Sequence, residues 1–101
     1  MTSPVDDWRT AETASLMEAI VSLRSVDEAA AFLRDLCTLR ELEEMTQRWT
    51  VVRLLSKGLS YRDIADRTGS STATVTRINQ WLQHGTGGYG KILERLSGEK
   101  S

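Results

Sequence analysis

The chain has 101 residues, of which 40% are hydrophobic and 27% charged, and its formal net charge is −1. This length fits one compact domain and is near the size at which a monomer cannot easily bury enough apolar surface. No stretch reaches the roughly 18 consecutive apolar residues of a membrane span. The acidic N-terminus MTSPVDDW is unlike a secretory signal. We therefore expect a soluble, cytoplasmic protein that gains stability by oligomerising.

Charge is unevenly distributed along the chain. Residues 1–35 carry seven acidic and three basic side chains, whereas residues 45–81 carry six basic and two acidic ones. Only the local field at a docking surface matters for binding a polyanion, so the small net charge does not exclude nucleic acid. Two solvated faces would give the same pattern, and the place of the basic side chains in the fold must decide between these interpretations.

Helix signals dominate the sequence, because its one proline is Pro4 and β-branched alternation is scarce. The first predicted helix covers residues 6–23, with Trp8, Leu16 and Ile20 among the residues on its apolar face. Trp8 is expected to anchor a core or a subunit interface.

A second helix is predicted to follow Ser25 and to end near Cys37. The segment from Ser25 to Glu28 has the form of a capping box, in which the serine hydroxyl accepts from a backbone N–H and the glutamate reaches back to the cap. The first two helices thus add apolar helical surface to a chain that is short for burying it as a monomer.

A core helix is predicted over residues 38–58. Its start, from Thr38 to Glu41, repeats the capping-box spacing. Gly58 is expected to end it, because glycine takes the left-handed conformation at little cost. The residues predicted to face inward are Leu39, Leu42, Met45, Trp49, Val52 and Leu55.

The most informative segment is residues 61–81, which has the pattern of two short helices separated by a glycine. Ser60 opens the first helix, Gly69 closes it, and Ser70 or Ser71 caps the second. The predicted apolar seam between the two helices consists of Ile64, Val75 and Ile78, with the small Ala65 where the helices cross. These spacings predict a helix-turn-helix.

The second helix of this motif begins with short side chains. A helix that enters the major groove needs short or hydrogen-bonding side chains at its leading end, and Arg62 lies where it can contact a base or phosphate. An ordinary helical hairpin with a solvent-facing Ser/Thr surface is the plainer alternative. Threonine is a poor filler for an exposed helix, and the basic stretch coincides with the hairpin, so we favour DNA binding. The short residues are Ser71, Thr72, Ala73, Thr74 and Thr76.

The chain is predicted to end in a short helix after a glycine-rich loop. The loop covers residues 84–88 and the helix residues 89–97, with Tyr89 and Leu93 on its apolar stripe. The tail, residues 97–101, is expected to be disordered.

Metal binding and catalysis are not predicted. The single cysteine and single histidine, Cys37 and His84, are far apart and lack both zinc-binding spacing and the partners that nucleophilic catalysis requires. Glu41, Glu43 and Glu44 fall in the first turn of a predicted helix, where the helix dipole favours negative charge. They therefore do not indicate an acid–base pair.

A family resemblance extends from Leu36 to Leu96. The segments LCTLRELE, QRWTVVRLLSKG and STATVTR, in this order, resemble the tryptophan repressor family, particularly its repressor-like branch of unknown effector. The resemblance implies an all-α, six-helix fold with a helix-turn-helix, in which residues 1–37 supply dimerisation helices that intertwine with those of a second protomer in a homodimer. It also implies a transcriptional regulator, a repressor, that binds double-stranded DNA at a pseudo-palindromic operator.

The resemblance assigns DNA-reading roles to particular residues of this sequence. The residues expected at the DNA are Arg62, Ser71, Thr72, Ala73, Thr76 and Arg77.

A helical module that binds other proteins through the same scaffold, without DNA, is the alternative function.

A small-molecule pocket is also implied by the resemblance. In tryptophan-binding members two arginines hold the ligand near a helix-capping threonine, and Arg48, Arg77 and Thr38 match these positions. Ile78 and Trp81 replace a glycine and a small serine of the family's pocket and would intrude on the ligand. Tryptophan is therefore not favoured as the effector, and no other cofactor is assigned.

Overall fold

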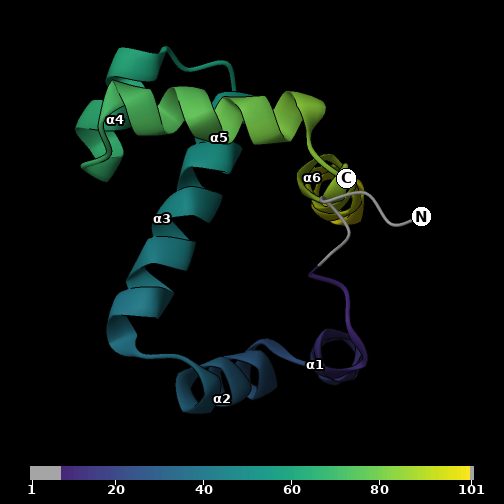
Figure 1. Cartoon of the computed structure of the whole chain (residues 1–101). Coiled ribbons are helices and arrows are strands. Elements are labelled where there is room, and N and C mark those ends of the chain that lie inside the picture. The colour runs from purple at the N-terminus through teal and green to yellow at the C-terminus, as the bar shows by residue number, and fades with distance from the viewer. Residues whose placement is uncertain (1–7, 101) are drawn as a thin grey trace. The chain divides into compact units, whose positions relative to one another are not determined.

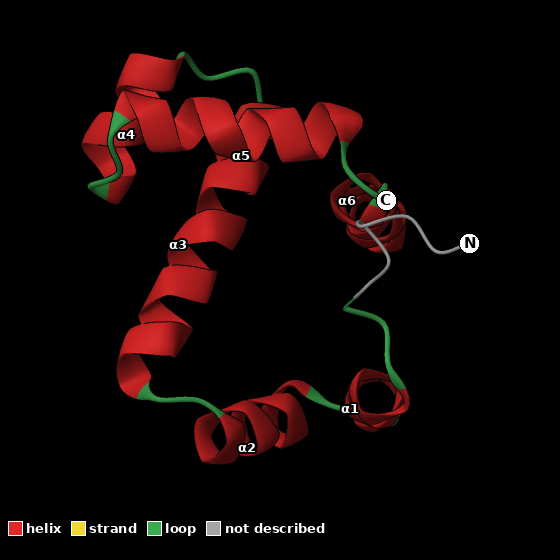
Figure 2. Cartoon of the chain, in the orientation of Figure 1, coloured by secondary structure: helices red, strands yellow, loops and turns green. Residues whose placement is uncertain are grey.

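The computed structural model describes the backbone of residues 8–100 and the side chains of residues 8–98. Figure 2 shows that every regular element in this range is a helix, and the helices are joined by loops and turns. The chain forms two compact units, an N-terminal unit ending at Leu39 and a C-terminal unit beginning at Arg40 (Figure 1). Within the described residues, the prediction of an all-α chain with six helices is confirmed.

The N-terminal unit contains two helices without a buried core. These are α1 (Ala11–Val21) and α2 (Val26–Leu36), and none of their side chains is buried. Val21 is 83% exposed and Val26 is 86% exposed, so apolar surface lies open on both helices. The N-terminal unit therefore lacks the burial that normally stabilises short helices.

Helix α1 starts later than predicted. The Thr10 hydroxyl oxygen accepts from the backbone N–H of Thr13 at 3.1 Å, and the Thr13 hydroxyl oxygen accepts from the backbone N–H of Thr10 at 2.7 Å. This reciprocal cap fixes the first turn at Ala11, so the placement of Trp8 within the helix was wrong. Trp8 precedes α1 and is 52% exposed, whereas Asp6 lies outside the described residues.

Helix α2 is capped as predicted, with one difference. The Ser25 hydroxyl oxygen accepts from the backbone N–H of Glu28 at 3.0 Å. The Glu28 carboxylate accepts from the backbone N–H of Arg24 at 3.2 Å, one residue before the cap itself. Both side chains therefore stabilise the helix start, although the glutamate does so outside the cap residue.

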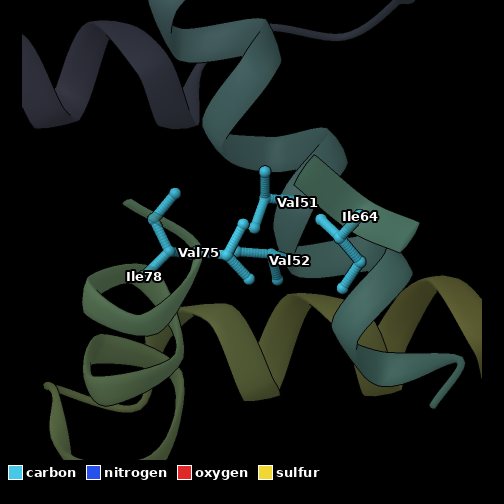
Figure 3. Close-up of a cluster of buried hydrophobic side chains, with 5 residues drawn as sticks. All are labelled: Val51, Val52, Ile64, Val75 and Ile78. Atoms are coloured by element: carbon cyan, nitrogen blue, oxygen red, sulfur yellow. The ribbon is translucent and has the colours of Figure 1, made fainter. Parts of the chain in front are cut away.

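The C-terminal unit packs four helices around one small core. Helix α3 (Leu39–Ser56) is followed by α4 (Tyr61–Thr68), α5 (Thr72–His84) and α6 (Gly88–Lys100). Helix α5 crosses the C-terminal end of α3 (Figure 1). Figure 3 shows the five side chains of the core, which are 0% or 1% exposed: Val51, Val52, Ile64, Val75 and Ile78.

The core engages only the C-terminal half of α3. Val52 was predicted to face inward and does so, but Val51 is equally buried and was not predicted. Leu39 is 59% exposed and Met45 is 37% exposed, so neither side chain belongs to the core of the C-terminal unit. The helical period alone could not show where along α3 the other helices would stop covering it.

Helix α6 is longer than predicted. Tyr89 and Leu93 pack against the core, and the ring centroids of Tyr89 and Trp49 lie 6.3 Å apart. The helix continues to Lys100, so the expectation of disorder from Ser97 onward was wrong for the described part of that tail. Gly98 does not stop it, because one glycine inside a helix costs only about 1 kcal/mol.

Candidate nucleic-acid interface

Helices α4 and α5 are joined by a tight turn of three residues, Gly69, Ser70 and Ser71. Gly69 has a φ of 76° in the left-handed region, and its backbone N–H donates to the carbonyl of Ala65 at 2.9 Å. The Ser71 hydroxyl oxygen accepts from the backbone N–H of Thr74 at 3.1 Å. Ser71 is therefore the cap of α5, which decides between the two serines that the sequence allowed.

The apolar seam between the two helices matches the prediction. Ile64 of α4 and Val75 of α5 are 0% exposed, and Ile78 of α5 is 1% exposed. Ala65 is half-buried against the same cluster. The helical hairpin is therefore held on α3 by complete burial of its seam residues.

Two long-range hydrogen bonds fix the hairpin further. The Gln47 amide of α3 donates to the carbonyl of Thr68 at 2.7 Å, at the end of α4. The Asn79 amide of α5 donates to the Tyr61 hydroxyl oxygen at 2.6 Å, at the start of α4. Each end of α4 is thus tied to a different helix. No local pattern in the sequence indicates these pairs, because the partners are 21 and 18 residues apart.

The residues predicted to read DNA all lie on exposed surface of this hairpin. Thr72 and Thr76 are one helical turn apart and share a face of α5. Gln80 lies one turn further along that face and is exposed as well. Sequence reasoning missed Gln80, although the same four-residue step could have found it. The exposed residues predicted to read DNA are Arg62 on α4 and Ser71, Thr72, Ala73, Thr76 and Arg77 at the start of α5.

A cleft of about 250 Å³ lies between α3 and α5. It brings together Arg48 and Arg77, the two arginines of the predicted pocket, whereas Thr38 belongs to the N-terminal unit. Ile78 closes the cleft from the core, and Trp81, which is 47% exposed, forms part of its wall. The remaining lining residues, Glu44, Gln47 and Thr74, were not predicted as pocket residues.

Other kinds of site find little support in the described chain. Across the residues that the structure describes, no group of three His, Cys, Asp or Glu side chains is arranged to hold a metal ion. The Cys37 thiol is half-buried and free. None of the described helices is both long enough and apolar enough to cross a membrane.

The geometry of the hairpin defines a class of protein. Two short helices meet at a glycine turn, the second exposes short side chains at its start and the first exposes an arginine, as in helix-turn-helix modules that dock on duplex DNA. The family model of the Trp repressor protein matches residues 11–97, and the chain belongs to this family. The family is one of regulators rather than enzymes, and it indicates a DNA-binding regulator.

Relatives and solved structures agree with this membership. The uncharacterized protein YerC of Bacillus subtilis (strain 168) is 37% identical over 92 residues, which cover 91% of this chain and 88% of YerC. The crystal structure of a TrpR-like protein from Eubacterium eligens ATCC 27750 matches with a TM-score of 0.86 and 40% identity, over 91% of this chain and 95% of that one. A candidate Trp repressor from Staphylococcus aureus matches with a TM-score of 0.86 and 33% identity, over 95% and 96% of the two chains. The all-α, six-helix fold of the protomer expected from the resemblance is therefore confirmed.

The turn between α4 and α5 generates a prediction about two glycines. Gly69→Ala should lower the free energy of unfolding by about 1 kcal/mol, because alanine is strained at a positive φ. Gly90→Ala, inside α6 with open space around its Cβ position, should raise it by up to about 1 kcal/mol. Urea titrations at equal chain concentration measure both changes. Equal effects of the two substitutions would show that the Gly69 conformation is not required.

Proposed function

We propose that this protein is a transcriptional regulator, a repressor, that binds a pseudo-palindromic DNA operator as a homodimer in the cytoplasm. The observation that carries the proposal is the exposed face of α5, where Thr72 and Thr76 lie on a helix fixed by its buried seam. A rigid helix with short side chains at its leading end can approach base edges in the major groove. Arg62 at the start of α4 supplies a cation beside that face.

The N-terminal unit supports the dimer. Its two helices have no buried side chain, and they expose Met17, Ile20 and Val21 on α1 and Val26 and Leu36 on α2. Apolar surface of this kind is normally covered, and a second copy of the same chain would cover it symmetrically. A dimer would also present two copies of α5, as two half-sites of an operator require.

Sedimentation measures the proposed assembly directly. At micromolar concentration the protein should sediment at about twice its chain mass of 11.3 kDa, because the N-terminal helices gain their core only from a partner. A single monomeric species at these concentrations would contradict the dimer.

Base contacts at the start of the hairpin are tested by two alanine substitutions. Arg62→Ala and Thr72→Ala should each weaken binding to a selected duplex by about 1–3 kcal/mol, the usual value of a base contact. Arg95→Ala, on α6 outside the motif, removes the same charge as Arg62→Ala and serves as the control. Titration of a labelled duplex gives the affinities, and circular dichroism verifies that the variants are folded. Unchanged affinity in both motif variants would show that the hairpin does not meet DNA through Arg62 and Thr72.

The cleft between α3 and α5 is the proposed effector site, if the regulator responds to a small molecule. Arg48 and Arg77 on its wall suit an anionic group. Ile78 on the same wall belongs to the buried core and cannot move aside without opening that core. This packing supports the expectation that free tryptophan is not the effector.

Calorimetry with millimolar tryptophan tests that expectation. We expect no saturable heat, because displacing a side chain packed in the core costs as much as the arginine contacts with the ligand return. Saturable binding in the micromolar range that disappears in Arg77→Ala would contradict the expectation and identify tryptophan as the effector.

A helical module for protein partners is the second candidate function. The uncovered apolar side chains of the N-terminal unit favour it, because they could equally receive another protein. This function would leave the short polar face of α5 without a role.

A further inference from the structure

We propose that Thr76 reads DNA through its methyl group, and that the operator therefore places a thymine opposite this side chain. The inference rests on the proposed DNA-binding function and specifies which base the centre of the α5 face selects. It follows from the hydrogen bonds that the hydroxyl groups of this face already donate within the protein.

The hydroxyl proton of Thr76 is committed within α5. Its Oγ1 atom donates to the backbone carbonyl of Thr72 at 2.9 Å, one turn earlier in the helix. A carbonyl oxygen can only accept, and a threonine hydroxyl has a single proton to give. Thr76 therefore cannot donate to an acceptor on a base edge without breaking this bond.

The same hydrogen bond leaves the methyl group as the part of the Thr76 side chain that has no partner within α5. In a helix, a threonine whose oxygen turns back to the preceding carbonyl has its Cγ2 methyl in the other branch of the side chain. Thr76 is exposed, so that methyl is available to a ligand. Ala73 is three residues earlier on the neighbouring position of the helix surface and adds a second exposed methyl. The centre of the α5 face thus carries two neighbouring methyl groups.

The other exposed hydroxyls at the start of α5 differ from one another. The Ser71 hydroxyl donates to the Thr74 hydroxyl oxygen at 3.0 Å, so its proton is also used inside the helix. Among the described residues no neighbour accepts the proton of Thr72, which leaves Thr72 able to donate to a base. Hydrogen bonding and apolar contact are therefore assigned to different threonines, Thr72 and Thr76.

Thymine is the base that fits an apolar contact. Its C5-methyl is the one apolar group that an ordinary base pair presents in the major groove, whereas the other groups there are donors and acceptors. Burying one methyl between protein and DNA corresponds to about a fourfold gain in affinity. A face of α5 with two neighbouring methyls should therefore select thymine over the other bases at one position of each half-site.

The test pairs a methyl of the protein with a methyl of the DNA. Duplexes that bind the full-length protein are first enriched from a random library, and each thymine of the enriched half-site is then replaced by uracil, which lacks only the methyl. The measured quantity is the ratio of the Kd for the uracil duplex to the Kd for the thymine duplex. For the parent protein this ratio should be about four at one position.

Two substitutions of Thr76 separate its methyl from its hydroxyl. Thr76→Ser keeps the hydroxyl that bonds to the Thr72 carbonyl and removes the methyl, so the ratio should fall towards one. Thr76→Val keeps a methyl at each branch and removes the hydroxyl, so the discrimination between thymine and uracil should persist. This double-mutant cycle isolates the contact between the two methyl groups from any general change in affinity.

Each outcome bears on the inference. A parent ratio near one at every thymine, or discrimination that survives in Thr76→Ser and is lost in Thr76→Val, would overturn the methyl contact while leaving DNA binding intact. Failure to enrich any sequence would overturn the proposed function and this inference with it. A ratio of about four that follows the methyl and not the hydroxyl would establish the contact.

Discussion

Burial of three side chains of the hairpin against the C-terminal half of α3 is the interaction on which the position of the exposed α5 face depends. Ile64, Val75 and Ile78 form one buried cluster with Val51 and Val52 of α3 (Figure 3). Complete burial of an aliphatic side chain contributes roughly 1.5–3 kcal/mol, whereas a helix of two turns such as α4 is not stable by itself in water. The geometry of the hairpin is therefore a property of its packing on α3 and not of its own helix propensity.

Polar contacts then set the orientation of α4 on α3, which burial alone does not determine. Apolar packing has no direction, so the rotation and slide of α4 on α3 are set by groups with fixed geometry. The amide of Gln47 holds the end of α4, and the amide of Asn79 holds its start through the Tyr61 hydroxyl. In the proposed function this fastening matters because Arg62 and the α5 face must meet the DNA together. In the same proposed function, a ligand in the cleft would act on the exposed α5 face through α5 itself, which carries both Arg77 and Thr76.

The sequence was sufficient for features that depend on near neighbours in the chain. Capping serines, the left-handed Gly69 and the helical spacing of the seam predicted the helices and the turn, because each is decided within a few residues. Contacts between distant residues were not predictable in this way. Three features follow only from how α3 packs against the hairpin. They are the hydrogen bond between Gln47 and Thr68, the burial of Val51, and the position of Glu44 on the cleft wall. The end of α6 was predicted too early. Nothing in its tail forbids a helix, and the structure continues the helix to Lys100.

The dependence of binding on salt tests most directly whether the exposed face of α5 docks on duplex DNA. For a selected duplex, the logarithm of the association constant should fall linearly with the logarithm of the salt concentration, with a slope of about −0.9 for each phosphate neutralised. Arg62→Ala should make this slope shallower if the arginine meets a phosphate, or lower the affinity for the selected sequence alone if it meets a base. A nearly flat dependence, with equal affinity for selected and random duplexes, would contradict docking on DNA and favour a protein partner.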